Sequence, residues 1–171
     1  WRIFNFNKQI QEIEMIKAVI LDVDGVIIDS EEAIAIASIQ MFRELYNIEV
    51  KARDFLPFVG TGSARYVEGV AEKYGIDIDV KKATKRREEN FIKNLSKLRL
   101  FPKVKDFIRI VKQTGLKIAI ATSSDQNRFQ PAFREVGLKE QQFDVIITGD
   151  QVKYKKPYPE IYLTTAKKLK L

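Results

Sequence analysis

The sequence of 171 residues predicts an α/β fold, in which a parallel sheet is interrupted by an all-helical insert. Three apolar runs of β type, at residues 18–21, 117–121 and 144–148, are each followed by a segment with helical spacing. The segment between the first two runs is too long for a plain connection between neighbouring strands. The length suits one domain that carries an inserted subdomain.

The insert after the first strand contains three helical patterns. Residues 31–46 carry a broad apolar face, and Ser30 followed by Glu31 and Glu32 is typical of a helix start. After an apolar run at 55–59 and a loop at 60–63, residues 64–74 and 80–95 predict two further helices.

The rest of the chain alternates helices and strands. Helices are expected at 104–114, at 130–136 and from about Glu160, and the strands 117–121 and 144–148 lie among them. We therefore expect residues 15–30 and 101–171 to form one domain, residues 31–100 to form the insert, and residues 1–14 to be an extension.

Composition excludes several classes of chemistry. The chain has no cysteine and no histidine, so disulfides, thiolate nucleophiles and histidine acid–base catalysis are excluded. No apolar run approaches the roughly 20 residues of a membrane span, and no secretory signal is evident. We expect a cytoplasmic protein that does not enter a membrane.

The formal charge of +7 is unevenly distributed, because ten Lys or Arg residues lie between Lys81 and Lys105. A solvated helix face, attraction of an anionic substrate and a nucleic-acid surface are all consistent with this segment. It lacks regular aromatic interleaving, which disfavours nucleic-acid binding.

Two carboxylates follow the first strand, at Asp22 and Asp24, and a glycine comes next. Ligands of parallel sheets bind beyond the carboxyl ends of the strands, and clustered carboxylates repel each other unless something offsets their charge. A divalent cation and a covalent phosphoryl intermediate would both do so. The alternative is a plain strand that ends in an Asp-Gly turn.

The other two strands are also followed by polar groups. Thr122 and Ser123 follow the second strand, and Lys156 comes after the third. Hydroxyls, backbone amides and a lysine at one edge of a sheet suit a phosphoryl group. Taken singly, a Thr-Ser pair is commonly a helix cap and a lysine before proline is commonly a surface residue.

With these residues, the chain resembles the haloacid dehalogenase-like hydrolases, and within them the β-phosphoglucomutase-like phosphatases with a helical cap. The resemblance implies a Rossmann-like sheet with the insert as cap, and Mg²⁺ held by the Asp22 carboxylate and the Asp24 carbonyl. Asp22 would be the nucleophile and Asp24 the general acid and base. Thr122 and the Ser123 amide would hold phosphoryl oxygens, and Lys156 would balance the charge of the nucleophile.

The sequence departs from this family's pattern in three places. Ile34 stands where the mutases have a histidine, which favours a hydrolase of small phosphorylated metabolites over a sugar-phosphate mutase. The second hinge reads Pro102-Lys103 rather than Pro-Gly. The family's fourth, acidic motif would lie past Leu171, so we expect a truncated chain with weak Mg²⁺ binding and turnover. A catalytically weak or inactive module that binds phosphate or a protein stays open as an alternative.

Two further expectations concern surfaces. The resemblance places Gly60, Thr61 and Arg65 where the cap reaches the substrate, although a surface arginine explains Arg65 equally well. Without a fourth strand, residues 17–22 would form an exposed sheet edge. Residues 1–14 or a neighbouring molecule could cover that edge, which makes an oligomer one expectation.

Overall fold

A computed structural model describes residues 16–59 and 62–171, and these form two compact units. The sheet unit contains the described residues up to Ile28, together with Leu100–Phe129 and Gly137–Leu171. The helical unit contains Asp29–Arg99 and Gln130–Val136. The 1–14 extension lies outside the described residues.

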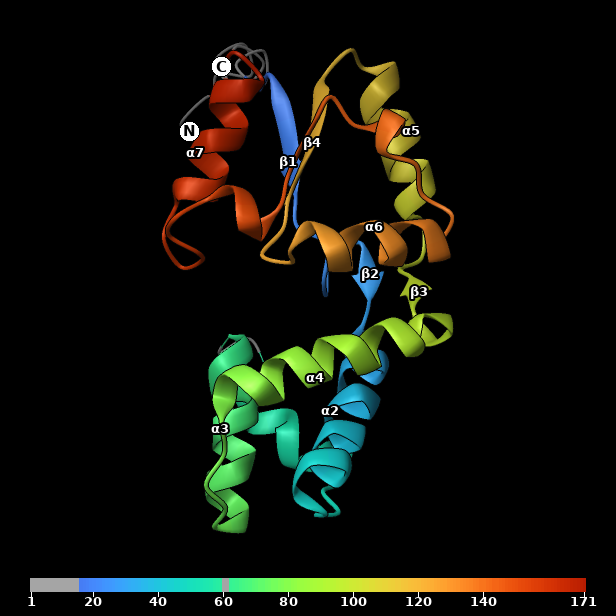
Figure 1. Ribbon diagram of the computed structural model, residues 1–171. Coiled ribbons are helices and arrows are strands. Elements are labelled where there is room, and N and C mark those ends of the chain that lie inside the picture. The colour runs from blue at the N-terminus through green and yellow to red at the C-terminus, as the bar shows by residue number, and fades with distance from the viewer. Residues whose placement is uncertain (1–15, 60–61) are drawn as a thin grey trace, which may run out of the picture. The chain divides into compact units, whose positions relative to one another are not determined.

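The sheet unit is built on three parallel strands in the order β1-β4-β5 (Figure 1). They are β1 (Ala18–Leu21), β4 (Lys117–Ala121) and β5 (Val145–Ile147). The three predicted strands and the predicted α/β fold with a parallel sheet are confirmed. β4 lies in the centre, and its residues from Ile118 onward are completely buried, as expected for a strand with neighbours on both sides.

Two helices pack on this sheet. α5 (Val104–Gln113) contacts β4, and α7 (Glu160–Lys168) contacts β4 and β5. In Figure 1 the strands β1 and β4 lie between these two helices. α7 buries Ile161 against Ala121 and Ile147, so an apolar cluster fixes the carboxyl ends of β4 and β5.

Helix α6 (Gln126–Glu135) begins four residues before the predicted start at residue 130. A carboxylate oxygen of Asp150 accepts a hydrogen bond from the Gln126 amide at 2.9 Å, which satisfies one of the donors at the helix start. This partner lies 24 residues further along the chain. The polar run Ser123-Ser124-Asp125 directly before Gln126 is also a local signal for this start, which the helical spacing alone did not include.

The helical unit packs three helices around one core (Figure 1). They are α2 (Glu31–Tyr46), α3 (Ser63–Tyr74) and α4 (Val80–Lys93), and Ala52–Phe58 adds turns of 3-10 helix. The core contains fully buried Met41, Phe42, Phe55, Val67 and Val70. All three helices were predicted, with ends that differ by two residues at most.

A buried acidic residue connects the 3-10 segment of this unit to helix α3. Asp54 is 3% exposed, and its carboxylate accepts hydrogen bonds from Lys73 (2.5 Å), Tyr74 (2.6 Å) and the Lys51 amide (2.8 Å). These donors, Lys73 foremost, hold the pKa of Asp54 well below its usual range.

Two short strands, β2 (Ile28–Asp29) and β3 (Arg99–Leu100), pair with each other. The chain passes from one unit to the other within each of them. This ribbon has no signature in the sequence, because strands of two residues carry no periodic pattern.

Among the described residues, β1 pairs only with β4 and is therefore an edge strand of the sheet. The proposed cover by residues 1–14 falls outside the described residues, and an oligomer through this edge stays a prediction. No helix in the described part of the chain is long and apolar enough to cross a membrane.

Candidate active site

The carboxyl end of β1 carries an aspartate that is paired with a lysine from another loop. Asp22 Oδ2 lies 2.7 Å from Nζ of Lys156, and Asp22 Oδ1 accepts a hydrogen bond from the Val23 amide at 2.8 Å. The side chains of Asp22 and Lys156 are 32% and 23% exposed. The carboxylate is thus oriented from both sides while still reachable from solvent.

Lys156 is anchored by its surroundings. Its ammonium also donates to the carbonyl of Ala121, the last residue of β4, at 3.1 Å, and lies 5.1 Å from the centre of the Tyr162 ring. These contacts hold the positive charge between the ends of β1 and β4. A cation in that position can neutralise an anionic nucleophile or a bound anion.

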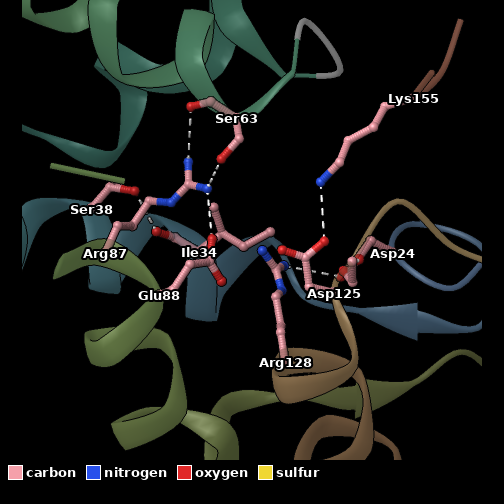
Figure 2. A network of polar contacts seen from close by, with 10 residues as sticks. Asp24, Ile34, Ser38, Ser63, Arg87, Glu88, Asp125, Arg128 and Lys155 are labelled. Atoms are coloured by element: carbon pink, nitrogen blue, oxygen red, sulfur yellow. Dashed lines mark hydrogen bonds and ion pairs between the residues drawn. The ribbon is translucent and has the colours of Figure 1, made fainter. Parts of the chain in front are cut away.

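Asp24 follows in a tight turn, and both of its carboxylate oxygens are contacted. Gly25 makes the turn possible with φ of +76°, and its amide donates to the Ile28 carbonyl at 2.9 Å. Ser124 Oγ donates to Asp24 Oδ2 at 2.8 Å, and Arg128 Nη2 lies 3.3 Å from Oδ1. Figure 2 shows Arg128 directed at Asp24.

The loop after β4 is held in a turn by its own first side chain. Thr122 is completely buried, its amide donates to the Ile147 carbonyl at 3.0 Å, and its Oγ1 accepts from the Ser124 amide at 3.1 Å. Ser123, between them, is exposed. The hydroxyl of Thr122 therefore shapes the loop, and the loop presents Ser123 to solvent.

The loop after β5 supports the loop after β4. The Gly149 amide donates to the Ser124 carbonyl at 2.9 Å, and a Cβ added at Gly149 would lie 2.2 Å from the Ser123 carbonyl oxygen. Only glycine permits this approach. On the exposed side, Lys155 pairs with Asp125 at 3.0 Å (Figure 2).

The structure thus brings Asp22, Asp24, Thr122, Ser123 and Lys156 to the same edge of the sheet. Gly60 and Thr61 lie outside the described residues. Arg65 belongs to the helical unit, where it pairs with Glu72 at 2.6 Å on an exposed face, 5.4 Å from the centre of the Phe58 ring. Its role toward a substrate stays a prediction.

Part of the basic segment 81–105 is paired within the helical unit. Arg86 contacts Glu44 at 2.7 Å and Glu89 at 3.0 Å, and Lys97 contacts Glu32 at 3.6 Å. Arg87 is buried and bonds both the carbonyl and the hydroxyl of Ser63 (Figure 2). Several of these cations therefore serve the packing of the unit.

The donor set suits a hard divalent cation. Asp22 and Asp24 offer oxygen atoms two residues apart, and Mg²⁺ is commonly held by one or two carboxylates with waters and substrate phosphate completing the shell. The described residues contain no group of three or more acidic side chains that could hold a metal by themselves. The arrangement fits Mg²⁺ bound jointly with a phosphate.

Sequence reasoning assigned no role to Ser124, Arg128 or Gly149. Ser124 directly follows Thr122 and Ser123, but its partner Asp24 lies 100 residues away. Arg128 lies 104 residues from Asp24 and in a helix that was predicted to start after it. No local signal could have identified that contact.

The family model described as haloacid dehalogenase-like hydrolase matches residues 19–171. The chain is 34% identical over 163 residues to the phosphorylated carbohydrates phosphatase of Thermotoga maritima, covering 90% of this chain and 70% of that protein. It is also 35% identical over 158 residues to the protein SUPPRESSOR OF QUENCHING 1, chloroplastic, of Arabidopsis thaliana.

That plant protein is much longer, because the match covers 89% of this chain and only 15% of the relative. Among solved structures, CbbY from Rhodobacter sphaeroides in complex with phosphate has a TM-score of 0.75 at 24% identity, covering 92% of this chain and 74% of that one. This likeness concerns the fold.

Proposed function

Because the chain belongs to the haloacid dehalogenase-like hydrolases, we propose that it is a Mg²⁺-dependent phosphomonoester hydrolase of small phosphorylated metabolites. The observation that supports this most is the Asp22–Lys156 ion pair at 2.7 Å, where β1 and β4 end. The name of the Thermotoga maritima relative, a phosphorylated carbohydrates phosphatase, supports the same substrate class.

In the first step, an Asp22 carboxylate oxygen attacks phosphorus and the bond from phosphorus to the ester oxygen breaks. Asp24 donates its proton to that leaving oxygen, so the products are an alcohol and an aspartyl-phosphate on Asp22. Lys156 offsets negative charge around the nucleophile.

In the second step, water attacks the phosphorus of the aspartyl-phosphate while Asp24 takes a proton from the water. The bond from phosphorus to the Asp22 oxygen breaks, which restores the carboxylate and releases inorganic phosphate. The hydroxyl of Thr122 and the amide of Ser123 hold phosphoryl oxygens through both steps. Asp24 ends protonated and is ready for the next ester.

The Asp22 carboxylate and the Asp24 carbonyl would hold Mg²⁺, with the substrate phosphate as a shared ligand. The ion supplies neutralisation of the charge that develops on the phosphoryl oxygens. The helical unit would act as a cap, with Gly60, Thr61 and Arg65 choosing the substrate.

The test is phosphate release from a panel of p-nitrophenyl phosphate, glycerol 3-phosphate, phosphoglycolate and glucose 6-phosphate. We expect turnover that is abolished by a chelator, restored by Mg²⁺ and absent in Asp22→Asn. An Asp22→Asn variant with wild-type rates would refute the mechanism. A protein that binds phosphate without hydrolysing any ester would favour the alternative of a binding module.

A further inference from the structure

Asp24 needs a defined orientation if it is to pass a proton to a leaving group. The torsion that orients an aspartate carboxyl is broad and has no sharp preferred value. A proton donor that rotates freely spends much of its time in unproductive positions, and a displacement of 1 Å can cost about 100-fold in rate. Something outside the residue must therefore fix the carboxyl plane.

The structure provides two contacts, one on each carboxylate oxygen. Ser124 Oγ holds Oδ2 at 2.8 Å, and Arg128 Nη2 holds Oδ1 at 3.3 Å. Ser124 comes from the loop after β4 and Arg128 from the first turn of α6, so both contacts come from the same stretch of chain. Rotation of the carboxyl would break both contacts.

Arg128 is well placed for this task because it is itself confined. Its side chain is only 16% exposed, against 34% for Asp24, so its charge is largely withdrawn from water. The α6 start that carries it is fixed by the Asp150 bond to the Gln126 amide. The neighbouring side chains of Lys155 and Asp125 are 55% and 57% exposed, so the charges of that ion pair are not withdrawn from water.

The two donors also differ in chemistry. A guanidinium can only donate, whereas a serine hydroxyl can donate or accept. Arg128 therefore keeps Oδ1 as an acceptor, and Oδ2 can accept from Ser124 while it carries a proton that points toward the leaving-group oxygen. The pair is compatible with both states of Asp24 that the reaction requires.

We propose that Arg128 is a positioning residue that, with Ser124, holds the Asp24 carboxyl in line with the leaving-group oxygen. This inference rests on the proposed function. Arg128 should therefore affect the rate of hydrolysis for esters whose leaving oxygen needs a proton. It should have little effect on the rate for esters whose leaving group departs without one.

The test compares two leaving groups in Arg128→Met. Nitrophenolate leaves without protonation, whereas an alkoxide does not. We expect kcat for the fastest alkyl ester of the panel to fall about 10- to 100-fold, as part of the 10²- to 10⁴-fold that acid–base catalysis supplies. For p-nitrophenyl phosphate we expect a change of less than about threefold.

Three controls separate positioning from a general loss of structure. Lys155→Met removes the neighbouring exposed ion pair and should leave both rates unchanged. Arg128→Lys keeps a cation and should recover part of the alkyl-ester rate. In an Asp24→Asn background, Arg128→Met should cause no further loss, because both changes then remove the same contribution.

Equal losses on both substrates, no loss on either, or a further loss in the Asp24→Asn background would overturn the assignment of Arg128 and leave the proposed function intact. A wild-type protein that hydrolyses no ester of the panel would overturn the proposed function and the inference together. A retained melting temperature in Arg128→Met excludes misfolding as the cause of the loss.

Discussion

Gly149→Ala tests whether the loop after β5 sets the shape of the loop after β4. The added Cβ would lie 2.2 Å from the carbonyl oxygen and 2.8 Å from the carbonyl carbon of Ser123. Both are backbone atoms of the loop that we propose binds phosphate. Because Gly149 has no positive φ, the conflict comes from this contact and not from backbone preference.

The size of the effect follows from the geometry. The 2.2 Å approach falls about 1.2 Å short of the 3.4 Å at which ordinary contact begins, so one of the two loops must shift by about that amount. Overpacking of this kind costs about 1–3 kcal/mol, or about 2–12 °C in melting temperature for a chain of this size. A displacement of about 1 Å at the Ser123 amide predicts a loss in kcat of about 100-fold.

The assay is phosphate release together with thermal unfolding, and Gly115→Ala is the matched control. Gly115 has φ of +77° with nothing within 4 Å of an added Cβ. That variant should lose about 1–2 kcal/mol of stability through backbone strain alone and keep its kcat. A Gly149→Ala protein with wild-type melting temperature and kcat would refute the reasoning.

Lys156→Ala should lower kcat about 10²- to 10³-fold, as measured by steady-state kinetics, because it removes the cation beside Asp22; an unchanged kcat would count against its role. With β-glucose 1-phosphate, phosphate should be released without accumulation of glucose 6-phosphate, and efficient isomerisation would contradict the preference for hydrolysis. Asp54→Asn should destabilise the chain by about 1–3 kcal/mol at pH 7 in urea unfolding. Since the pKa of Asp54 is lowered in the folded state, its contribution is complete above the unfolded pKa of about 3.9 and is lost as pH falls further, so the variant should show a weaker acid dependence.

Local patterns were sufficient for the elements that bury a continuous apolar face. The run at 18–21 became β1 and the run at 117–121 became β4, because β1 is apolar throughout and β4 is apolar from Ile118 to Ala121. The positions of Asp22 and Thr122 then followed from topology, since the carboxyl ends of parallel strands lie at one edge of the sheet.

Features that depend on distant partners could not be predicted in this way. The ribbon of β2 and β3 depends on pairing across the whole insert. The contact between Arg128 and Asp24 joins residues 104 positions apart. None of these has a signature in the residues next to it.

The central claim is that Asp22 is the nucleophile, and a crystal structure of the wild-type protein with Mg²⁺ and fluoroberyllate tests it most directly. Fluoroberyllate binds a carboxylate oxygen as a mimic of the acyl phosphate. The account predicts beryllium bonded to an Asp22 carboxylate oxygen, with its fluorines near Thr122, the Ser123 amide and Lys156. Beryllium bonded to a different side chain, or an unmodified Asp22 beside a bound fluoroberyllate, would contradict it.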